Sequence, residues 1–174
     1  MEDEVKVILV DEQDREWGFM EKMEAHRKAM LHRAISVFIT NSKGEWLLQR
    51  RSADKYHSQG LWTNTCCSHP YPGEPVSEAA RRRLAEEMGL KSDLVHLFSF
   101  IYKEELNDEL TEHELDHVFH STIDDLPVIN TSEVMEWKYI PFSELKTDVM
   151  ANPLNYSVWF RKIYERVNKS IYNI

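Results

Sequence analysis

The chain has 174 residues, the length of one domain with one sizeable hydrophobic core. Hydrophobic residues make up 42% and charged residues 29%, with 5 Gly and 6 Pro, which excludes collagen-like, low-complexity and disordered proteins. A net charge of -9 repels polyanions and argues against general binding to nucleic acid or to an anionic membrane.

Basic residues are nevertheless concentrated between Arg50 and Arg83. Six Lys and Arg side chains in this stretch stand against three acidic ones, which gives it a charge of +3 and leaves -12 for the rest of the chain. This distribution predicts a local pocket for an anion on an acidic protein.

The start of the chain has neither the basic segment nor the cleavage site of a signal peptide, and no run of 18 apolar residues occurs. The two cysteines, Cys66 and Cys67, are adjacent, a spacing that fits neither a disulfide framework nor a zinc knuckle. These features predict a soluble, cytoplasmic protein with reduced cysteines, one of which is available for chemistry.

The first half of the chain contains predicted strands joined by polar turns. Residues 5–10 are a short apolar strand candidate, and residues 22–31 have a helical composition. Residues 34–40 and 46–49 are predicted strands separated by Asn-Ser-Lys-Gly, with Gly44 at the position that tolerates positive φ. This spacing predicts a hairpin.

In the second half, the Pro-rich segment 69–75 can only be a loop, and it leads into a predicted helix over 76–88. Pro75 suits the first helical position and Gly89 the C-terminal cap. A final helix is expected to begin at Pro153. Three further strands are expected, at 94–102, 117–123 and 136–140. No linker divides the chain, so we expect one α+β domain with a mixed sheet covered by helices.

The predicted helix 76–88 carries the most informative pattern of charges. Arg83 and Glu87 share one face at i, i+4 spacing, Glu86 lies alongside, and the preceding loop contributes Glu74. Grouped carboxylates suit Mg²⁺, which takes oxygen ligands and bridges to phosphate. The helix composition taken alone favours a solvated helix with i, i+4 ion pairs.

The order of these residues resembles the Nudix box, GxxxxxE, then seven residues, then REUxEExGU with U aliphatic. Glu74 is followed after seven residues by RRLAEEMGL at 82–90. Two positions depart from the box, because Ser68 replaces the opening Gly and Arg83 replaces the Glu of the RE pair. In Nudix hydrolases that Glu helps to hold the metal cluster, so Arg83 argues against diphosphate hydrolysis and offers a cation for phosphate.

Two further segments group residues that carry chemistry. Cys67 precedes His69 in WTNTCCSHP, and a thiol beside a histidine and near cations is a candidate acid, base or nucleophile. For a lone cysteine, a buried inert thiol is the commoner interpretation. On an extended chain Glu112 and Glu114 point to one side, which is costly unless they share a metal or a proton. An acidic loop rim is the alternative.

His26, His32 and His69 can join two glutamates in a site for a metal such as Zn²⁺ or Mn²⁺, although each histidine alone fits an ordinary surface or core position. The other histidines are interpreted in this ordinary way, and two of them, His113 and His117, lie close enough to the acidic pair to support it. They are His57, His96, His113, His117 and His120.

These segments occur together in one family. They closely resemble the type 1 isopentenyl-diphosphate delta-isomerases of the Nudix superfamily over most of the chain, and this implies one α/β/α Nudix-like catalytic domain over 1–174. The resemblance rests on LHRA at 31–34, LLQRR at 47–51, WTNTCCSHP at 62–70, the box, and EHELD at 112–116.

The resemblance implies interconversion of isopentenyl diphosphate and dimethylallyl diphosphate. A glutamate-linked acid protonates the terminal alkene carbon, a tertiary carbocation forms, and a cysteine on the opposite face removes the neighbouring proton. At the matching positions, Glu114 is on the acid side, assisted by Tyr102, and Cys67 is the base. Trp159 matches the residue whose ring stabilises the cation, by roughly 2 kcal/mol or more in a water-free pocket. Trp62 is expected to line the same pocket.

The resemblance also implies two metal ions. A divalent ion, Mn²⁺, Mg²⁺ or Zn²⁺, is expected on His26, His32, His69, Glu112 and Glu114. A Mg²⁺ ion is expected to arrive with the diphosphate and to contact Glu87. The implied diphosphate contacts are Lys22, Arg51, Lys55 and Arg83.

Two other classes of function remain open on the sequence. One is a Nudix hydrolase of a nucleoside or other diphosphate, and the other is a non-catalytic binding module stabilised by metal. The expected partner is a small prenyl diphosphate substrate, with neither nucleic acid nor membrane, and the chain is expected to be a monomer or a homodimer.

Overall fold

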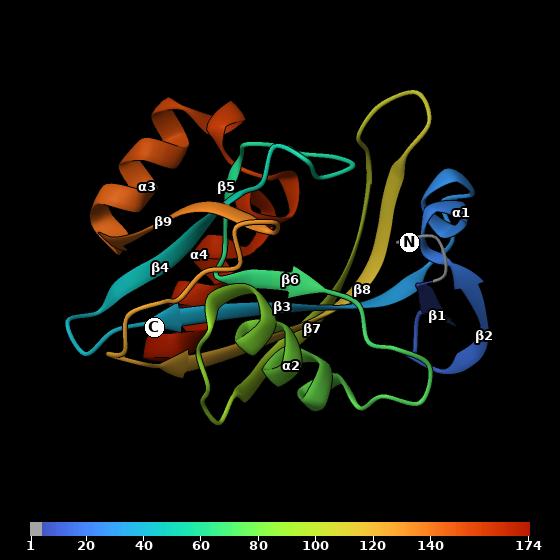
Figure 1. Cartoon of the computed structure of the whole chain (residues 1–174), viewed down its shortest axis with the longest axis horizontal. Helices are drawn as coiled ribbons and strands as arrows, with labels where there is room; N and C mark the ends of the chain where they lie inside the picture. The colour runs from blue at the N-terminus through green and yellow to red at the C-terminus, as the bar shows by residue number, and fades with distance from the viewer. Residues whose placement is uncertain (1–4) are drawn as a thin grey trace.

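A computed structural model describes residues 5–174, in which nine strands form one mixed sheet with four helices around it (Figure 1). The strands are β1 (Lys6–Val10), β2 (Glu16–Glu21), β3 (His32–Thr40), β4 (Glu45–Arg51), β5 (Trp62–Thr63), β6 (Cys66–Ser68), β7 (Val95–Glu105), β8 (Thr111–Thr122) and β9 (Val134–Pro141). The helices are α1 (Lys22–Arg27), α2 (Val76–Met88), α3 (Phe142–Ala151) and α4 (Val158–Tyr172), with a short 3-10 helix at Pro153–Asn155.

Strand β3 is the centre of the sheet. It pairs in parallel with β8 along its whole length, in a register that sets His32 beside Glu114. The other edge of β3 is shared by three antiparallel strands: β1 at His32, β6 at residues 35–37 and β4 at residues 39–40. Strand β7 extends the sheet beyond β8, and β9 extends it beyond β4.

Side-chain alternation along β3 divides the core into two layers. Ile35, Val37 and Ile39 pack in the cluster that α2 covers, whereas Phe38 packs in the cluster that α3 and α4 cover. Figure 1 shows α2 in front of the sheet and α4 behind it. The expected α+β fold with a mixed sheet covered by helices is confirmed, and residues of β3 with even numbers face the α4 side.

The end of helix α2 requires a glycine. Gly89 has a φ of 65°, and a Cβ atom at this position would lie 2.6 Å from the carbonyl oxygen of Val128. The predicted helix 76–88 is confirmed, with Pro75 one residue earlier than expected, as the N-cap. The cap and the proline therefore fix the position of the charged face of α2 along the chain.

Several elements differ from the sequence prediction. Strands β2, β5 and β6 and helix α3 were not predicted, and β8 begins at Thr111 rather than at 117. Pro153 opens only the 3-10 helix, because Tyr156 is extended and forms a β-bridge with Trp62 before α4 begins at Val158.

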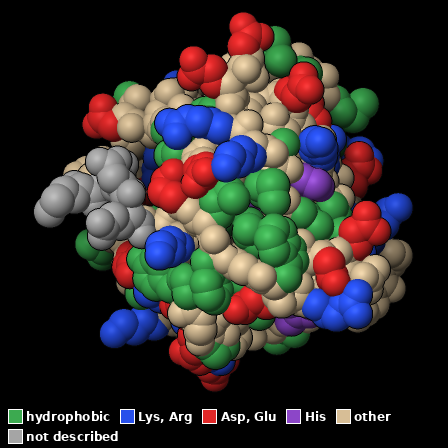
Figure 2. Space-filling view, turned by 90° about the vertical axis from the view of Figure 1, so that its right-hand side faces the viewer, with side chains coloured by type: hydrophobic (Ala, Val, Ile, Leu, Met, Phe, Trp, Pro, Cys, Tyr) green, Lys and Arg blue, Asp and Glu red, His purple; other side chains and the backbone are tan. Residues whose placement is uncertain are grey.

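Among residues 5–174, no helix is long and apolar enough to cross a membrane. Residues 1–4, at the start of the chain where a signal peptide was not expected, lie outside the described residues. Figure 2 shows the face at the α1 and β2 end of the molecule, where apolar side chains gather among charged ones. Trp17 and Phe19 of β2 are among the exposed apolar residues.

Candidate active site

A pocket of about 400 Å³ is lined by side chains from the α4 face of the sheet, from the segment after β4 and from helix α2. Residues paired across neighbouring strands point to the same face, so the β3 register fixes which side chains enter it. Glu114 lies opposite His32, and Cys67 lies opposite Ser36, which has the same parity as Phe38 in the α4 cluster. The pocket residues used below are Lys22, Arg51, Lys55, His57, Cys67, His69, Arg83, Tyr102, Glu112, Glu114 and Trp159.

The acid side of the pocket is a hydrogen-bonded pair of side chains on the β7–β8 hairpin. Tyr102 lies opposite Glu114 in the strand register, and its hydroxyl donates to Glu114 Oε2 at 2.8 Å. Burial, together with the charges of Glu112 and Glu114, raises the pKa of Tyr102 well above its usual value. The phenol therefore stays protonated at neutral pH and holds its proton next to the carboxylate.

The two adjacent cysteines point to opposite faces of the sheet. Cys66 is fully buried in the cluster under α2, whereas Cys67 lines the pocket. Burial raises the pKa of Cys67 to about 12, against the opposing effect of Arg51. The Cys67 thiol is therefore neutral in the free protein. His69, two residues further along the chain, contacts the acid side of the pocket, with its Nε2 2.9 Å from Glu114 Oε1.

Buried histidines and a glutamate form a group that can hold a metal ion. Ligand atoms of His26, His32, His69 and Glu114 lie within 4.8 Å of one another. The Nδ1 atoms of His26 and His32 lie 2.7 and 2.8 Å from the backbone oxygens of residues 22 and 30. A backbone acceptor at Nδ1 places the proton there and leaves the Nε2 lone pair for a metal.

The protonation states of His69 and Glu114 also suit a metal. Burial lowers the pKa of His69 to about 4, so its imidazole is neutral at pH 7. Burial alone would raise the pKa of Glu114, but the contacts with His32 and His69 outweigh it and hold that pKa well below the usual value. Buried Nε2 atoms of His26 and His32 have no hydrogen-bond partner. The donor set thus fits a divalent ion.

Glu112 belongs to a second, overlapping group with His26 and His57. Burial and Glu114 act to raise the pKa of Glu112, but the two histidines outweigh them and lower it. His57, interpreted in the sequence as an ordinary surface or core histidine, is buried, and its Nε2 lies 2.8 Å from Glu112 Oε1 in a group that can hold a metal ion. The only sign in the sequence that His57 belongs to the site was its position two residues after Lys55 in an otherwise polar stretch.

Metal binding at the first group is expected to stabilise the chain. An ion present at 100 times its Kd adds about 2.7 kcal/mol, which raises the Tm of a chain of this size by about 5 to 10 °C. Thermal melts of the metal-stripped protein with added Mn²⁺ or Zn²⁺ measure the shift, and His69→Ala is expected to reduce it. A wild-type Tm that none of Mn²⁺, Zn²⁺ and Mg²⁺ raises would contradict the assignment.

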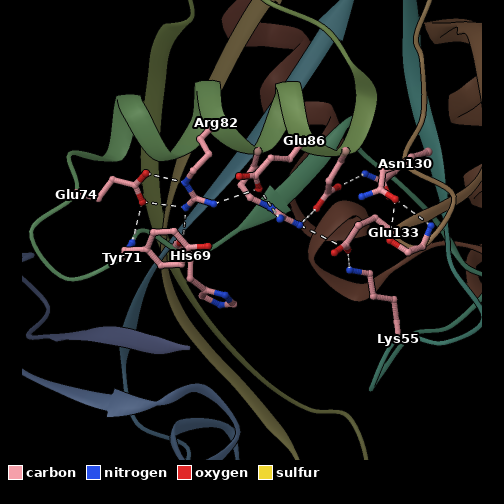
Figure 3. Close-up of polar contacts among 12 residues, drawn as sticks. Lys55, His69, Tyr71, Glu74, Arg82, Glu86, Asn130 and Glu133 are labelled. Atoms are coloured by element: carbon pink, nitrogen blue, oxygen red, sulfur yellow. Dashed lines mark hydrogen bonds and ion pairs between the residues drawn. The ribbon is translucent and has the colours of Figure 1, made fainter. Parts of the chain in front are cut away.

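The four cations predicted to contact a diphosphate line the pocket: Lys22, Arg51, Lys55 and Arg83. Lys22 Nζ lies 4.5 Å from the centre of the Tyr56 ring. Lys55 pairs with Glu133, and Arg83 lies 3.5 Å from the same carboxylate. Figure 3 shows Lys55 and Glu133 facing each other below helix α2. Half of the basic stretch identified by charge therefore lines one pocket, through Arg51, Lys55 and Arg83.

The carboxylates of the box are bound to arginines. Glu74 accepts from the Arg82 guanidinium at 2.7 and 2.9 Å, at the far end of the chain of contacts in Figure 3. Glu87 is buried, accepts from Gln49 Nε2 at 2.7 Å and pairs with Arg83. Glu87 is in neither metal-holding group and lies behind Arg83, which faces the pocket.

Trp159, in the first turn of α4, forms one wall of the pocket. Its indole N–H donates to Asn64 Oδ1 at 3.2 Å, and the Arg51 guanidinium carbon lies 5.2 Å from its ring centre. Trp62 was expected to line the same pocket but does not; its ring packs under Lys138 at 4.2 Å. The bridge between Trp62 and Tyr156 directs it away.

His113 and His117 do not support the acidic pair. Their odd positions on β8 place them on the opposite face from Glu112 and Glu114. His113 Nδ1 lies 2.8 Å from the Ala29 carbonyl oxygen, and His117 Nε2 lies 2.9 Å from an oxygen of Asp14. The earlier expectation for these two histidines was therefore wrong.

Comparisons with known proteins identify the family to which this fold belongs. A family model of the NUDIX domain matches residues 30–166, so the fold and the site define a NUDIX-domain protein. An isopentenyl-diphosphate Delta-isomerase 2 of Aromatoleum aromaticum is 51% identical over 167 residues, 96% of this chain and 87% of the relative. An isopentenyl-diphosphate Delta-isomerase of Pectobacterium atrosepticum is 49% identical over 162 residues, 93% of this chain and 90% of the relative. The chain belongs to the isopentenyl-diphosphate delta-isomerase family, which confirms the resemblance seen in the sequence.

Solved structures support the fold. A crystal structure of a Deinococcus radiodurans protein has a TM-score of 0.71 at 23% identity and covers 84% of this chain and 90% of its own. A MutT protein from Methanosarcina mazei has a TM-score of 0.65 at 21% identity and covers 80% of this chain and 94% of its own. At these identities the likeness extends to the fold alone.

Proposed function

We propose that this chain interconverts isopentenyl diphosphate and dimethylallyl diphosphate through a tertiary carbocation. One observation carries the proposal: Cys67 and the Tyr102–Glu114 pair line one pocket together with four cations. A reaction that adds a proton at one carbon and removes another proton nearby needs two separate proton carriers. A diphosphate needs the cations.

The first step is addition of a proton to the terminal alkene carbon. The proton that Tyr102 donates to Glu114 Oε2 is available to this carbon by way of the carboxyl group. The π electrons form the new C–H bond, and the positive charge moves to the tertiary carbon. After turnover Glu114 and Tyr102 recover a proton from solvent, and the base releases to solvent the proton that it has taken, so that protons balance over one cycle.

The second step is removal of a proton from the carbon next to the cation. The Cys67 sulfur takes this proton, and the electrons of the broken C–H bond form the new double bond. Because burial keeps the resting Cys67 as a thiol, its proton must first pass to solvent, and the Arg51 guanidinium lowers the cost of the thiolate. In the reverse direction, the thiol is already the proton donor.

The cation between these steps needs protection from water, which would trap it as an alcohol. Trp159 offers the face of an indole ring, which stabilises a cation without reacting with it. Its hydrogen bond to Asn64 fixes the ring plane. We therefore assign Trp159 to stabilisation of the carbocation.

Two ions complete the proposal. His26, His32, His69, Glu112 and Glu114 would hold a Mn²⁺, Mg²⁺ or Zn²⁺ ion, which when bound fixes the acid-side carboxylates and balances their charge. Glu87 would contact a Mg²⁺ ion that arrives with the diphosphate, once Arg83 turns from Glu87 towards the substrate. Lys22, Arg51, Lys55 and Arg83 bind the diphosphate oxygens.

Lys55→Ala is expected to raise KM for isopentenyl diphosphate by about 10- to 100-fold with a smaller effect on kcat, because a charged hydrogen bond contributes about 1.5 to 3 kcal/mol. Steady-state kinetics measure both constants. Lys138→Ala, which removes a lysine outside the pocket, is the matched control and should leave KM unchanged. A large loss of kcat at constant KM would refute the binding role of Lys55.

The proposal is tested by incubating the metal-loaded protein with isopentenyl diphosphate in deuterated water. Dimethylallyl diphosphate with deuterium in a methyl group is the expected product. Release of phosphate without allylic product would instead indicate a Nudix hydrolase, the alternative that Arg83 in the box opposes.

The proposal also includes the cellular location and the oligomeric state of the chain. We place the chain, residues 1–174, in the cytoplasm as one catalytic domain acting as a monomer or homodimer on a small-molecule substrate. A cytoplasmic location suits chemistry that needs Cys67 as a free thiol, because cytosolic thiols are kept reduced. Both cysteines are free in the structure.

A further inference from the structure

His57 lies in the segment between β4 and β5 that also carries Lys55 and Tyr56. Only 6% of its surface is exposed, and it lines the pocket. Its ring packs at 4.3 Å, edge to face, on the ring of Tyr56. A histidine buried at this depth needs partners for its polar atoms, so its contacts indicate its role.

Three functional parts of the pocket meet at His57. Its Nε2 lies 2.8 Å from Glu112 Oε1, and its ring meets the Trp159 ring edge to face at 5.8 Å between centres. Its carbonyl oxygen accepts from Arg51 Nη2 at 3.2 Å. His57 thus contacts Glu112 of the metal centre, the Trp159 ring assigned to the carbocation, and Arg51, which is assigned to the diphosphate.

The two oxygens of Glu112 face different imidazoles. Oε2 lies 3.4 Å from His26 Nε2, and Oε1 lies 2.8 Å from His57 Nε2. His26 also belongs to the group formed with His32, His69 and Glu114, whereas His57 does not. An ion in that larger group therefore lies on the His26 side of Glu112, and His57 reaches it through the carboxylate.

Three polar atoms in this arrangement have no well-aligned hydrogen-bond partner within the chain. His57 Nε2 and Glu112 Oε2 are buried without a well-aligned hydrogen-bond partner, as is His26 Nε2. A small turn of the Glu112 carboxylate would align Oε1 with the His57 N–H and leave Oε2 for the ion. Carboxylates that bind metals are commonly held by such a donor.

We propose that His57 is a positioning residue, which holds Glu112 so that its other oxygen faces the metal centre. The inference rests on the metal centre of the proposed function and extends it by a residue between the ion and Trp159. A second ion bound directly by His26, His57 and Glu112 is the competing arrangement.

Three variants test the proposal: His57→Phe, His57→Ala and His57→Gln. Phe keeps the packing on Trp159 without a donor, and Gln restores an N–H donor. The apparent Kd for Mn²⁺ is measured on metal-stripped protein by chelator competition, without substrate. We expect Phe and Ala to weaken binding by about 10- to 100-fold and Gln to recover most of the loss. The Tm of the metal-free protein should not fall with Phe.

His96→Ala, which removes an exposed histidine outside the pocket, is the control and should bind Mn²⁺ as the wild type does. Unchanged affinity in His57→Phe overturns the proposal. Two ions per wild-type chain, with one lost in every His57 variant, overturns it in favour of direct ligation. Because affinity is measured without turnover, a failed isomerase assay with these affinity changes would reject the proposed function alone.

Discussion

Replacing Cys67 by alanine is expected to lower kcat by about three powers of ten, because a positioned acid or base contributes about 10²- to 10⁴-fold. The substitution removes the only thiol that lines the pocket among the described residues. KM should change little, since the diphosphate cations are retained. Kinetics with isopentenyl diphosphate measure both values, and circular dichroism checks the fold.

The adjacent cysteine is the matched control. Cys66 carries the same side chain one position earlier and faces the α2 layer, so Cys66→Ala should keep kcat within a few fold. Its cost should be a loss of about 1 kcal/mol in the free energy of unfolding from a small cavity. Turnover retained in Cys67→Ala, or equal losses in both variants, would remove Cys67 from the mechanism.

Glu114→Gln is expected to have an effect at least as large on kcat. The amide keeps the shape of the side chain but loses the charge that His32 and His69 face. It also breaks the proton pair with Tyr102. We therefore expect two losses from one substitution, about three powers of ten or more in kcat and a weaker Kd for Mn²⁺.

Tyr102→Phe separates these two losses. It removes the hydroxyl that donates to Glu114 Oε2 but leaves the metal-binding group intact, so kcat should fall while Mn²⁺ affinity stays close to that of the wild type. The control for Glu114→Gln is Glu105→Gln, which removes the same charge at the exposed end of β7 and should change neither kcat nor the Kd for Mn²⁺. Near wild-type turnover in Glu114→Gln would show that Glu114 does not take part in protonating the alkene.

Patterns within a few residues of sequence predicted the elements whose ends are set by neighbouring residues. Helix α2 was located by Pro75, by the spacing of Leu84 and Met88, and by Gly89, each of which acts within a few residues. Helix α3 was not predicted although Pro141 is its N-cap, as Pro75 is of α2; its C-cap is Asn152 and not a glycine in the left-handed region. The short strand β6 exists only because it pairs with β3, a contact between residues about thirty positions apart.

Strand alternation and family motifs predicted part of the candidate site. Alternation placed Glu112 and Glu114 on one side, as the structure has them. Applied consistently, the same alternation would have excluded His113 from their support. His57 has no periodic signal, and its place beside Glu112 depends on how the segment after β4 folds over the sheet, which only tertiary structure specifies.

The parallel register of β3 and β8 makes the site sensitive to the length of the chain. Insertion or deletion of one residue within β8 would exchange its two faces and turn Glu112, Glu114 and Asp116 into the opposite layer together. The turn at 106–110, closed by a backbone contact of 2.9 Å, lies outside this register and can absorb changes in length. Length variation among natural versions of this chain should therefore gather at the hairpin tip and avoid the strand beside it.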